Sequence, residues 1–482
     1  MKSLTCESRG RLSITGQKQT AAVERFHFIG AGGIGMSGLA KLLLKRNCIV
    51  SASDQEKSPV TDGLAELGVE MRIGHGEANL ADRRQTVVIS AAVKEDNPEL
   101  KLARKRGLRI FKYAQMLGTL MNDYDGAAVA GTHGKSTTSG WLVYTLKQLG
   151  VDANFIIGAN ISQLGTNSGA GNSRIFVAEA CEYDRSFLNL RPKIGCIMNI
   201  EADHLDYYKD EAEIVEAFDD FAGNIKDDGI LIANGSDPNV KKILQNGRAK
   251  NFQTIGFERS CDFYAENLRL QNGLYSFDAY NNGSFLGNAR ISVPGRHNVF
   301  NAMAVIAMAV NLGCDGPQTV AELGKFTGMD RRIMERARVN GVVILDDYAH
   351  HPTEIRASLE AIKQLYQPRR LWCVFQPHQY SRTRFLLDDF AESFKLADMT
   401  IVPEIYFVRD SVESKKEVNA AVLAERIRTK GSNALFIDGF EKICDYLVEN
   451  VSDGDLVVTM GAGDVWKVAD EYIQRSGKDS KK

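Results

Sequence analysis

The chain has 482 residues, which at about 150 residues per domain suggests three domains. Its 59 Lys and Arg residues balance 61 Asp and Glu residues, so overall charge gives no indication of a nucleic-acid partner or an anionic membrane surface. The sequence has no apolar run long enough for a transmembrane helix or a secretory signal, and its eight cysteines form no CxxC pair. We therefore expect a reduced, cytoplasmic protein without membrane insertion. We also expect the polar residues 1–22 to form a mobile tail.

The first predicted domain, residues 23–122, has alternating apolar segments and helical stretches. Residues 26–29 predict a strand that enters a glycine-rich loop and then an amphipathic helix. A second strand starts at Ile49 and ends at Asp54, and residues 86–90 form a third. Such alternation predicts a parallel, doubly wound sheet.

The loop after the first strand contains Gly30, Gly32, Gly33 and Gly35. Glycines let backbone N–H groups approach a phosphate at a helix N-terminus. Asp54 ends the next strand, where a dinucleotide-binding fold would hold a ribose. The pattern favours phosphate binding, most obviously in a dehydrogenase. The alternative is that the glycines only permit tight packing.

The second predicted domain, residues 123–327, contains a stronger signal. A strand over residues 127–130 enters Gly-Thr-His-Gly-Lys-Ser, and a helix follows over residues 137–149. This is a shortened P-loop, because Val129 stands where the usual motif has its first glycine. Lys135 would supply charge to nucleotide phosphates and Ser136 would bind Mg²⁺. The alternative is a surface turn with a solvated lysine.

Two polar segments follow buried strands of this domain, at residues 177–184 and 199–206. The carboxyl ends of parallel strands meet in one crevice, so we expect Glu179 and His204 to reach Lys135. A carboxylate suits Mg²⁺ well, and a histidine ligand is less common. Without the P-loop upstream, solvated loop side chains would be the simpler interpretation. Further along, residues 252–293 predict antiparallel strands, and residues 298–311 predict an apolar helix.

The third predicted domain, residues 328–482, is again α/β. Its expected strands are residues 342–345, 371–375, 399–402, 435–437 and 456–460. Three segments dense in polar side chains accompany the last two domains: residues 294–298, 346–352 and 376–384. Their basic and imidazole groups suit carboxylates and phosphates. The alternative for each is a capped loop, and we do not expect His350 and His351 to form a zinc pair, because no further ligand spacing accompanies them.

Taken together, the ordered motifs resemble the Mur ligase family across most of the chain. These motifs are GAGGIGM, AGTHGKS, EACEYDRSFL, NIEADHLD, PGRHN, DDYAHHPTE and FQPHQYSRTR. The resemblance implies an α/β protein of three domains, in which two Rossmann-like, doubly wound domains flank a central P-loop ATPase domain. It also implies that the first glycine loop binds a UDP-sugar and not a dinucleotide.

The resemblance is closest to the members that use ATP and Mg²⁺ to join L-alanine to the lactyl carboxylate of UDP-N-acetylmuramate, through an acyl phosphate, for peptidoglycan precursors. The main alternative is a related ligase that adds a recycled murein tripeptide to the same sugar. Residues 376–378 and 381–384 match the alanine-adding pattern better. A dehydrogenase and a non-catalytic nucleotide-binding module are the other hypotheses. We expect a monomer or a homodimer.

The resemblance also implies roles for individual residues. The ATP-binding residues would be Gly131, Thr132, His133, Gly134, Lys135, Ser136, Thr137, His297, Asn301, Arg331 and Asp346, with Asp347 as the alternative to Asp346. The UDP-sugar would contact Gly30, Gly32, Gly33, Ile34, Gly35, Met36, Asp54, Ser90 and Arg384. The metal ligands would be Ser136, Glu179 and His204. The catalytic residues would be Lys135, His204, His351, His378 and Arg382.

Three departures from the family pattern concern the central domain. Ser136 replaces the usual threonine and keeps the hydroxyl. Cys181-Glu182-Tyr183 stands where Asp-Glu-Ser is usual, while Glu179 is intact. Some family members use a carbamylated lysine downstream of His204. Residues 211–221 contain no lysine, so we predict no carbamate here.

Overall fold

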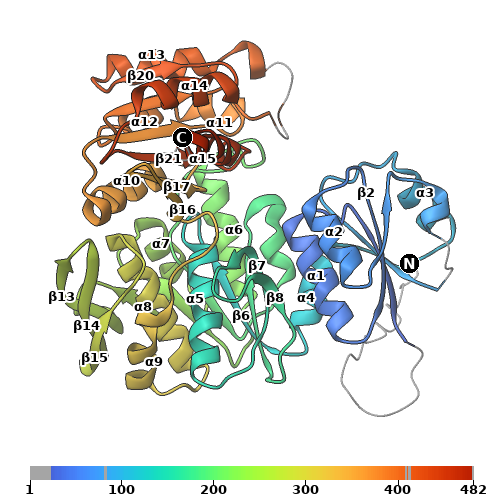
Figure 1. Ribbon diagram of the computed structural model, residues 1–482. Helices are drawn as coiled ribbons and strands as arrows, with labels where there is room; N and C mark the ends of the chain where they lie inside the picture. The colour runs from blue at the N-terminus through green and yellow to red at the C-terminus, as the bar shows by residue number, and fades with distance from the viewer. Residues whose placement is uncertain (1–22, 81–83, 408–409, 411–413, 480–482) are drawn as a thin grey trace.

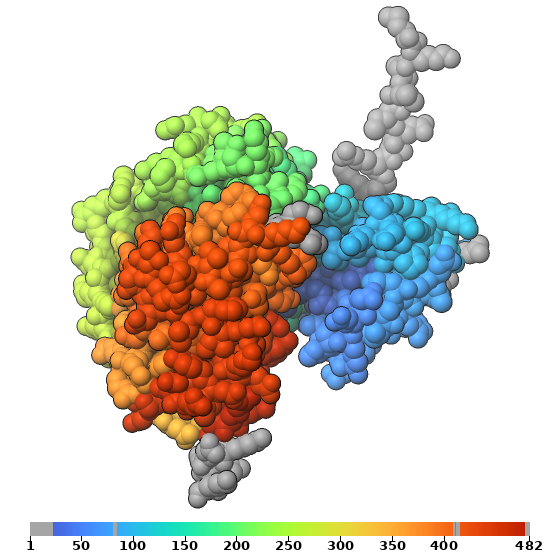
Figure 2. All heavy atoms as spheres, turned by 90° about the horizontal axis from the view of Figure 1, so that it is seen from above, coloured from blue at the N-terminus to red at the C-terminus, as the bar shows by residue number. Residues whose placement is uncertain are grey.

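The computed structural model describes residues 23–80, 84–407, 410 and 414–479. The predicted tail, residues 1–22, lies outside this part of the chain. Three α/β units follow one another along the sequence, each with its own sheet (Figure 1). Viewed from above, the third unit covers much of the central unit, and the first unit lies to one side (Figure 2). The three-domain α/β prediction is confirmed.

The first unit is a five-stranded parallel sheet in the order β3-β2-β1-β4-β5. Its strands are β1 Arg25–Ile29, β2 Ile49–Asp54, β3 Glu70–Ile73, β4 Thr86–Ile89 and β5 Ile110–Lys112. Its helices are α1 Ile34–Lys45, α2 Pro59–Glu66, α3 Pro98–Lys105, α4 Tyr113–Met121 and the short η1 Glu77–Asn79. Leu39, Leu42 and Leu43 of α1 are fully buried. Because α1 also packs on β7 and β8 of the central sheet, it fixes the first unit to the second.

The central unit is a ten-stranded mixed sheet in the order β15-β14-β13-β12-β11-β10-β6-β9-β7-β8. Its strands are β6 Asp125–Ala130, β7 Asn154–Ile161, β8 Thr166–Gly169, β9 Ile175–Glu179, β10 Ile194–Ile197, β11 Ile230–Asn234, β12 Phe252–Gly256, β13 Phe263–Gln271, β14 Leu274–Asn281 and β15 Ser284–Arg290. Its helices are α5 Lys135–Gln148, α6 Glu211–Gly223, α7 Pro238–Asn246, α8 Arg296–Asn311 and α9 Gly316–Glu322, with η2 Tyr183–Asn189 and η3 Leu323–Lys325.

The prediction of antiparallel strands over residues 252–293 is only partly right. β13, β14 and β15 form an antiparallel meander, but β12 pairs in parallel with both β11 and β13. β12 follows helix α7 and therefore extends the parallel core of the sheet before the meander begins. The apolar helix predicted over residues 298–311 is α8, whose long row of buried side chains packs on α5 and the sheet.

The third unit is a six-stranded sheet in the order β16-β17-β21-β18-β19-β20, parallel except for the edge strand β16. Its strands are β16 Met334–Val339, β17 Val342–Asp347, β18 Leu371–Phe375, β19 Met399–Val402, β20 Ala434–Phe436 and β21 Leu456–Met460. Its helices are α10 Pro352–Tyr366, α11 Tyr380–Phe385, α12 Leu387–Glu392, α13 Ala420–Thr429, α14 Phe440–Asn450, α15 Trp466–Asp479 and the short η4 Ser414–Lys416.

The strands of the three sheets come from residues 25–112, 125–290 and 334–460. The domain boundaries at residues 122 and 327 stay predictions. Near the second one, Met329 packs into the core of the central unit and Asp330 accepts hydrogen bonds from Asn160 and Ser162. The chain therefore leaves the central unit a few residues after position 327. No helix in the described ranges is both long enough and apolar enough to cross a membrane.

Candidate active site

The P-loop between β6 and α5 has the backbone that its glycines predict. Gly131 has a φ of +144° and Gly134, the residue before α5, has a φ of +85°. A Cβ at Gly131 would lie 2.9 Å from Cβ of Met198, and one at Gly134 would lie 2.9 Å from Oδ1 of Asn301. Glycine is therefore required at both positions. The N–H groups at the start of α5 are oriented to bind an anion.

Lys135 is held inside the central unit by a partner that the motif alone did not identify. Its Nζ donates to the carbonyls of Gly131 (2.5 Å) and Thr132 (3.1 Å) and lies 2.9 Å from Oε1 of Glu182. Burial alone would lower the pKa of Lys135, but the charge of Glu182 raises it above the ordinary value. The ammonium is thus charged and neutralised by a buried carboxylate.

The three predicted metal ligands lie together in one cavity of about 630 Å³, which we call the large cavity. Ser136, Glu179 and His204 line it with Lys135 and Glu182. Oε1 of Glu179 accepts the Gly158 N–H at 2.5 Å, and Nε2 of His204 lies 3.6 Å from Oε1 of Glu182. His204 has a φ of +54°, a rare conformation for this residue type. A hydroxyl and a carboxylate are ligands that Mg²⁺ accepts, so these residues fit the ion.

The third unit supplies cationic and imidazole groups to the same cavity. Arg331, Arg332, Tyr348 and His350 line it. The guanidinium carbons of both arginines lie 5.1 Å from the centre of the Tyr348 ring, so the ring lies within cation–π distance of each. Arg331 also donates to the Gly461 carbonyl at 2.8 Å. These contacts fix the guanidinium groups opposite the P-loop.

Asp346 and Asp347 have different environments. Asp346 is fully buried, and its two carboxylate oxygens accept from Arg331 (2.9 Å) and Thr459 (2.8 Å). It thus orients Arg331 and lies outside the lining of the large cavity. Asp347 faces a second cavity, and its Oδ2 has no hydrogen-bond partner among the described residues. Burial raises the pKa of Asp347 to about 6. Geometry therefore favours Asp347 as the residue that meets a ligand.

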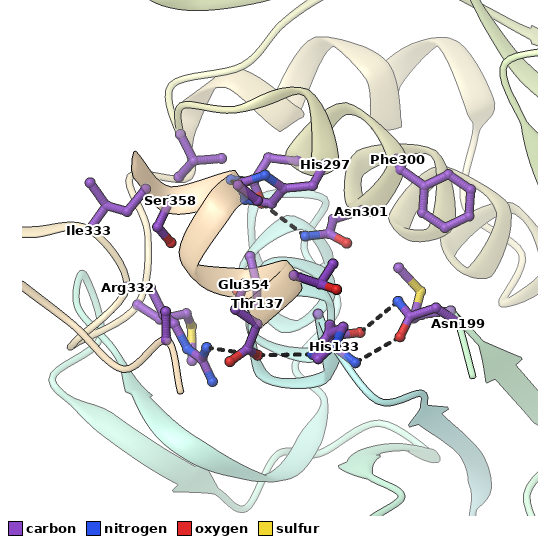
Figure 3. Close-up of a pocket in the computed structure, with 18 of the residues that line it drawn as sticks. His133, Thr137, Asn199, His297, Phe300, Asn301, Arg332, Ile333, Glu354 and Ser358 are labelled. Carbon is purple, nitrogen blue, oxygen red and sulfur yellow. Dashed lines mark hydrogen bonds and ion pairs between the residues drawn. The ribbon is translucent and has the colours of Figure 1, made fainter. Parts of the chain in front are cut away.

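The second cavity, of about 240 Å³, lies between α8 and α10, and we call it the small cavity (Figure 3). His297 and Asn301 line it, as predicted for ATP-binding residues, together with apolar Val293 and Phe300. Figure 3 also shows Glu354 between His133 and Arg332. Its Oε1 lies 3.2 Å from Nδ1 of His133 and 3.9 Å from the Arg332 guanidinium.

The neighbouring histidines His350 and His351 point to different sites. His350 lines the large cavity, and its ring centre lies 6.1 Å from that of His378. Burial lowers the pKa of His350 to about 4; Glu354 opposes this shift and Arg382 adds to it. His351 is 5% exposed, caps α10 and lies 4.6 Å, ring to ring, from His133. The structure thus brings His350 to the large cavity in the place where we expected His351.

Arg382 forms an ion pair across two units. Its Nε and Nη2 donate to Oδ1 of Asp203 at 3.0 and 2.7 Å, and both side chains are buried. His378 is close to Arg382, with 3.3 Å between Nδ1 and Nη1, and its ring stacks on Tyr406. The two predicted residues therefore lie together near the large cavity. Arg384 pairs instead with Glu417 on the surface, so its assignment to the UDP-sugar has no support in this geometry.

The glycine loop of the first unit borders a third cavity of about 360 Å³, which we call the loop cavity. Gly33, Gly35, Met36 and Ser90 line it, and residues of η2 close its other side. Ile34 reaches the large cavity. Gly30 and Gly32 shape the loop, since a Cβ at either would meet Ser90 or Asp54.

Asp54 holds this loop through its side chain. Its Oδ2 accepts the Gly32 N–H at 2.7 Å. The residue expected to hold a ribose therefore supports the loop in this structure. The sequence did not identify this role, nor those of Glu182, Asp203 and His350, because each depends on a contact between distant segments.

The chain is similar to known proteins over most of its length. Three family models match in order: Mur ligase family, catalytic domain (residues 25–125), Mur ligase middle domain (129–309), and Mur ligase, glutamate ligase domain (331–463). The chain belongs to the Mur ligase family.

Among its curated relatives is the UDP-N-acetylmuramate–L-alanine ligase of Acetivibrio thermocellus, 41% identical over 93% of this chain and 95% of that protein. The corresponding ligase of Clostridium acetobutylicum is 40% identical over 94% and 98%. The solved UDP-N-acetylmuramate–alanine ligase of Thermotoga maritima has a TM-score of 0.79 at 27% identity and covers 94% of this chain and 99% of that one. A murein peptide ligase of Psychrobacter arcticus has a TM-score of 0.71 at 26% identity with the same coverage.

Proposed function

We propose that this protein joins L-alanine to the lactyl carboxylate of UDP-N-acetylmuramate and converts ATP to ADP and phosphate in the same reaction. The observation that carries the proposal is the large cavity, where the P-loop Lys135 and the carboxylate Glu179 lie opposite His350 and the arginines of the third unit. Nearly full-length similarity to curated alanine-adding ligases supports the same substrates.

The chemistry needs two displacements. A carboxylate is a poor electrophile, so its oxygen first attacks the γ-phosphorus of ATP, the bond to the bridging oxygen breaks, and ADP leaves. The uncharged amine of alanine then attacks the acyl carbon, phosphate leaves with the bonding electrons, and the nitrogen loses a proton. Positioning and charge neutralisation are the main tasks of the protein.

The triphosphate of ATP would lie on the N–H groups at the start of α5. Lys135 would exchange its contact with Glu182 for the phosphates, which keeps the buried ammonium paired throughout. The base would enter the small cavity beside His297 and Asn301, and Asp347 and Arg332 would meet the sugar and phosphates. Arg331, oriented by Asp346, would stabilise the transferred phosphoryl group.

Mg²⁺ would be held by Ser136 and Glu179, with His204 next to them at the acyl end. The ion neutralises charge on the phosphate oxygens when it is bound. Glu182 lines the same cavity, and one of its oxygens has no hydrogen-bond partner among the described residues. Glu182 could therefore share this role. The UDP-sugar would lie along the loop cavity, with its lactyl carboxylate directed to the large cavity.

His350, His378 and Arg382 would hold the substrate carboxylate or the amino acid. Arg382 now pairs with Asp203 of the central unit, and we expect a shift of the third unit to accompany its release to substrate. Such motion between domains is the usual expectation for interfaces of this kind. The cytoplasmic location and the oligomeric state, monomer or homodimer, stay predictions.

A coupled ADP-release assay tests the proposal. ADP release should require both UDP-N-acetylmuramate and L-alanine. Turnover with a murein tripeptide in place of alanine would instead support the recycling ligase. ATP binding without turnover would identify a non-catalytic module, and reduction of a nicotinamide cofactor would identify a dehydrogenase.

A further inference from the structure

Two histidines and a glutamate meet where the third unit contacts the P-loop. His133 belongs to the loop, Glu201 follows β10, and His351 precedes α10. One potential ligand atom from each lies within 4.8 Å of those of the other two. Nε2 of His133 is 3.5 Å and Nδ1 of His351 is 3.7 Å from the same Glu201 oxygen, Oε2.

The cluster has unused coordinating capacity. Nε2 of His133 and Nε2 of His351 are buried and have no hydrogen-bond partner among the described residues. Nδ1 of His351 accepts the Thr353 N–H at 3.3 Å, and coordination through this nitrogen would replace that hydrogen bond. Buried polar atoms are normally satisfied, so the unpaired Nε2 of His351 and the long 3.5 Å contact between Nε2 of His133 and Glu201 call for an explanation.

Two of the three separations between the potential ligand atoms are close to those around a small transition-metal ion, and the third lies within 4.8 Å. Zinc bonds of about 2.1 Å at tetrahedral angles separate ligand atoms by about 3.4 Å. The observed separations of 3.5 and 3.7 Å need little adjustment. Two imidazoles with one carboxylate suit zinc and its neighbours, whereas Mg²⁺ prefers oxygen ligands.

The surroundings orient the ligands. Oε1 of Glu354 lies 3.2 Å from Nδ1 of His133, which leaves Nε2 facing Glu201. A carboxylate behind a histidine is the arrangement found around many protein-bound metals. The Thr353 hydroxyl donates to Oε2 of Glu201 at 2.7 Å and fixes that carboxylate.

We propose that His133, Glu201 and His351 form a binding site for a divalent transition metal such as Zn²⁺, separate from the Mg²⁺ ligands Ser136, Glu179 and His204. Since His133 and Glu201 come from the central unit and His351 from the third, the bound ion links the two units in their present arrangement. Dissociation of the ion lets the units separate.

Cobalt titration tests the site without relying on ligase activity. Co²⁺ is added to the full-length protein in excess Mg²⁺, and its visible ligand-field absorption is followed for the wild type, His351→Asn and Glu201→Gln. Asparagine retains a cap for α10, and glutamine retains an acceptor for Thr353. His204→Asn is the matched control, because it changes the proposed Mg²⁺ site and leaves His133, Glu201 and His351 in place.

We expect one bound Co²⁺ per chain in the wild type, at least tenfold weaker binding in His351→Asn and Glu201→Gln, and unchanged binding in His204→Asn. Zn²⁺ should displace the cobalt and raise the melting temperature of the wild type but not of His351→Asn. Melting curves without metal check that each variant is folded. The proposal is overturned if the wild type shows no absorption, if both variants retain it, or if only His204→Asn loses it.

Discussion

Two buried ion pairs at the large cavity differ in what they join. Lys135 and Glu182 both belong to the central unit, whereas Arg382 and Asp203 connect the third unit to the central one. A phosphate can take the place of Glu182 while the domains stay fixed. Exchange of Asp203 for substrate at Arg382, in contrast, breaks a contact between the third and central units. Replacement of Glu182 at Lys135 is therefore local, whereas replacement of Asp203 at Arg382 also affects how the two units are held together.

Loss of the Lys135 ammonium should have the largest effect on ligase activity. Lys135→Ala removes the positive charge that would stabilise the transferred phosphoryl group. We expect ADP release to fall by about 10³-fold or more. It also leaves Glu182 buried without its partner, which should cost on the order of 3 kcal/mol of unfolding free energy. Urea denaturation and the coupled assay measure the two effects. Adding Glu182→Gln should restore stability but not activity; recovery of activity in that double variant would contradict the assignment.

Loss of the Arg382 guanidinium, which joins the third unit to the central one, should lower ligase activity less. Arg382→Ala should lower kcat/KM on the order of 10²-fold, because the substrate carboxylate loses a positioning group. Asp203→Asn keeps Arg382 and should cost about tenfold or less, but it should make the ligand-free protein more open in small-angle scattering. Scattering profiles that do not change on Asp203→Asn would show that this ion pair does not hold the units together.

Glu179→Gln should raise the Mg²⁺ concentration needed for half-maximal activity by about tenfold, since an amide is a poorer ligand for a hard cation. The matched variant is Glu182→Gln, which changes the neighbouring carboxylate and the Lys135 pair. A magnesium titration that responds to Glu182→Gln and not to Glu179→Gln would reassign the metal ligand.

His350 should make stability depend on acid pH. Its pKa is about 4 in the folded chain and about 6.5 when unfolded, so the unfolded state binds more protons between these values. Stability should therefore fall as pH decreases from about 6.5 to 4, with a slope of up to about 1.4 kcal/mol per pH unit from this residue. Urea denaturation at several pH values should give a flatter dependence for His350→Gln; an equal slope would show that other groups dominate.

The sequence predicted what depends on local pattern. Apolar strands leading into glycine loops predicted both strand–loop–helix junctions, and Gly131 and Gly134 indeed have conformations that need glycine, while the assignment of ligands to these loops stays a prediction. It could not distinguish His350 from His351, since adjacent residues differ only in the direction that the fold gives them. It also did not find Asp203 as the partner of Arg382, because 179 residues separate them and the contact exists only after two units pack.

The central claim is that ATP activates the carboxylate of the UDP-sugar and that alanine contributes only its amine. UDP-N-acetylmuramate labelled with ¹⁸O in its lactyl carboxylate tests this most directly. Attack by that carboxylate on the γ-phosphorus leaves one labelled oxygen in the released phosphate, which mass spectrometry detects. We predict one ¹⁸O atom per phosphate at full labelling. Unlabelled phosphate, or label arriving only from alanine labelled in its own carboxylate, would contradict the direction of activation.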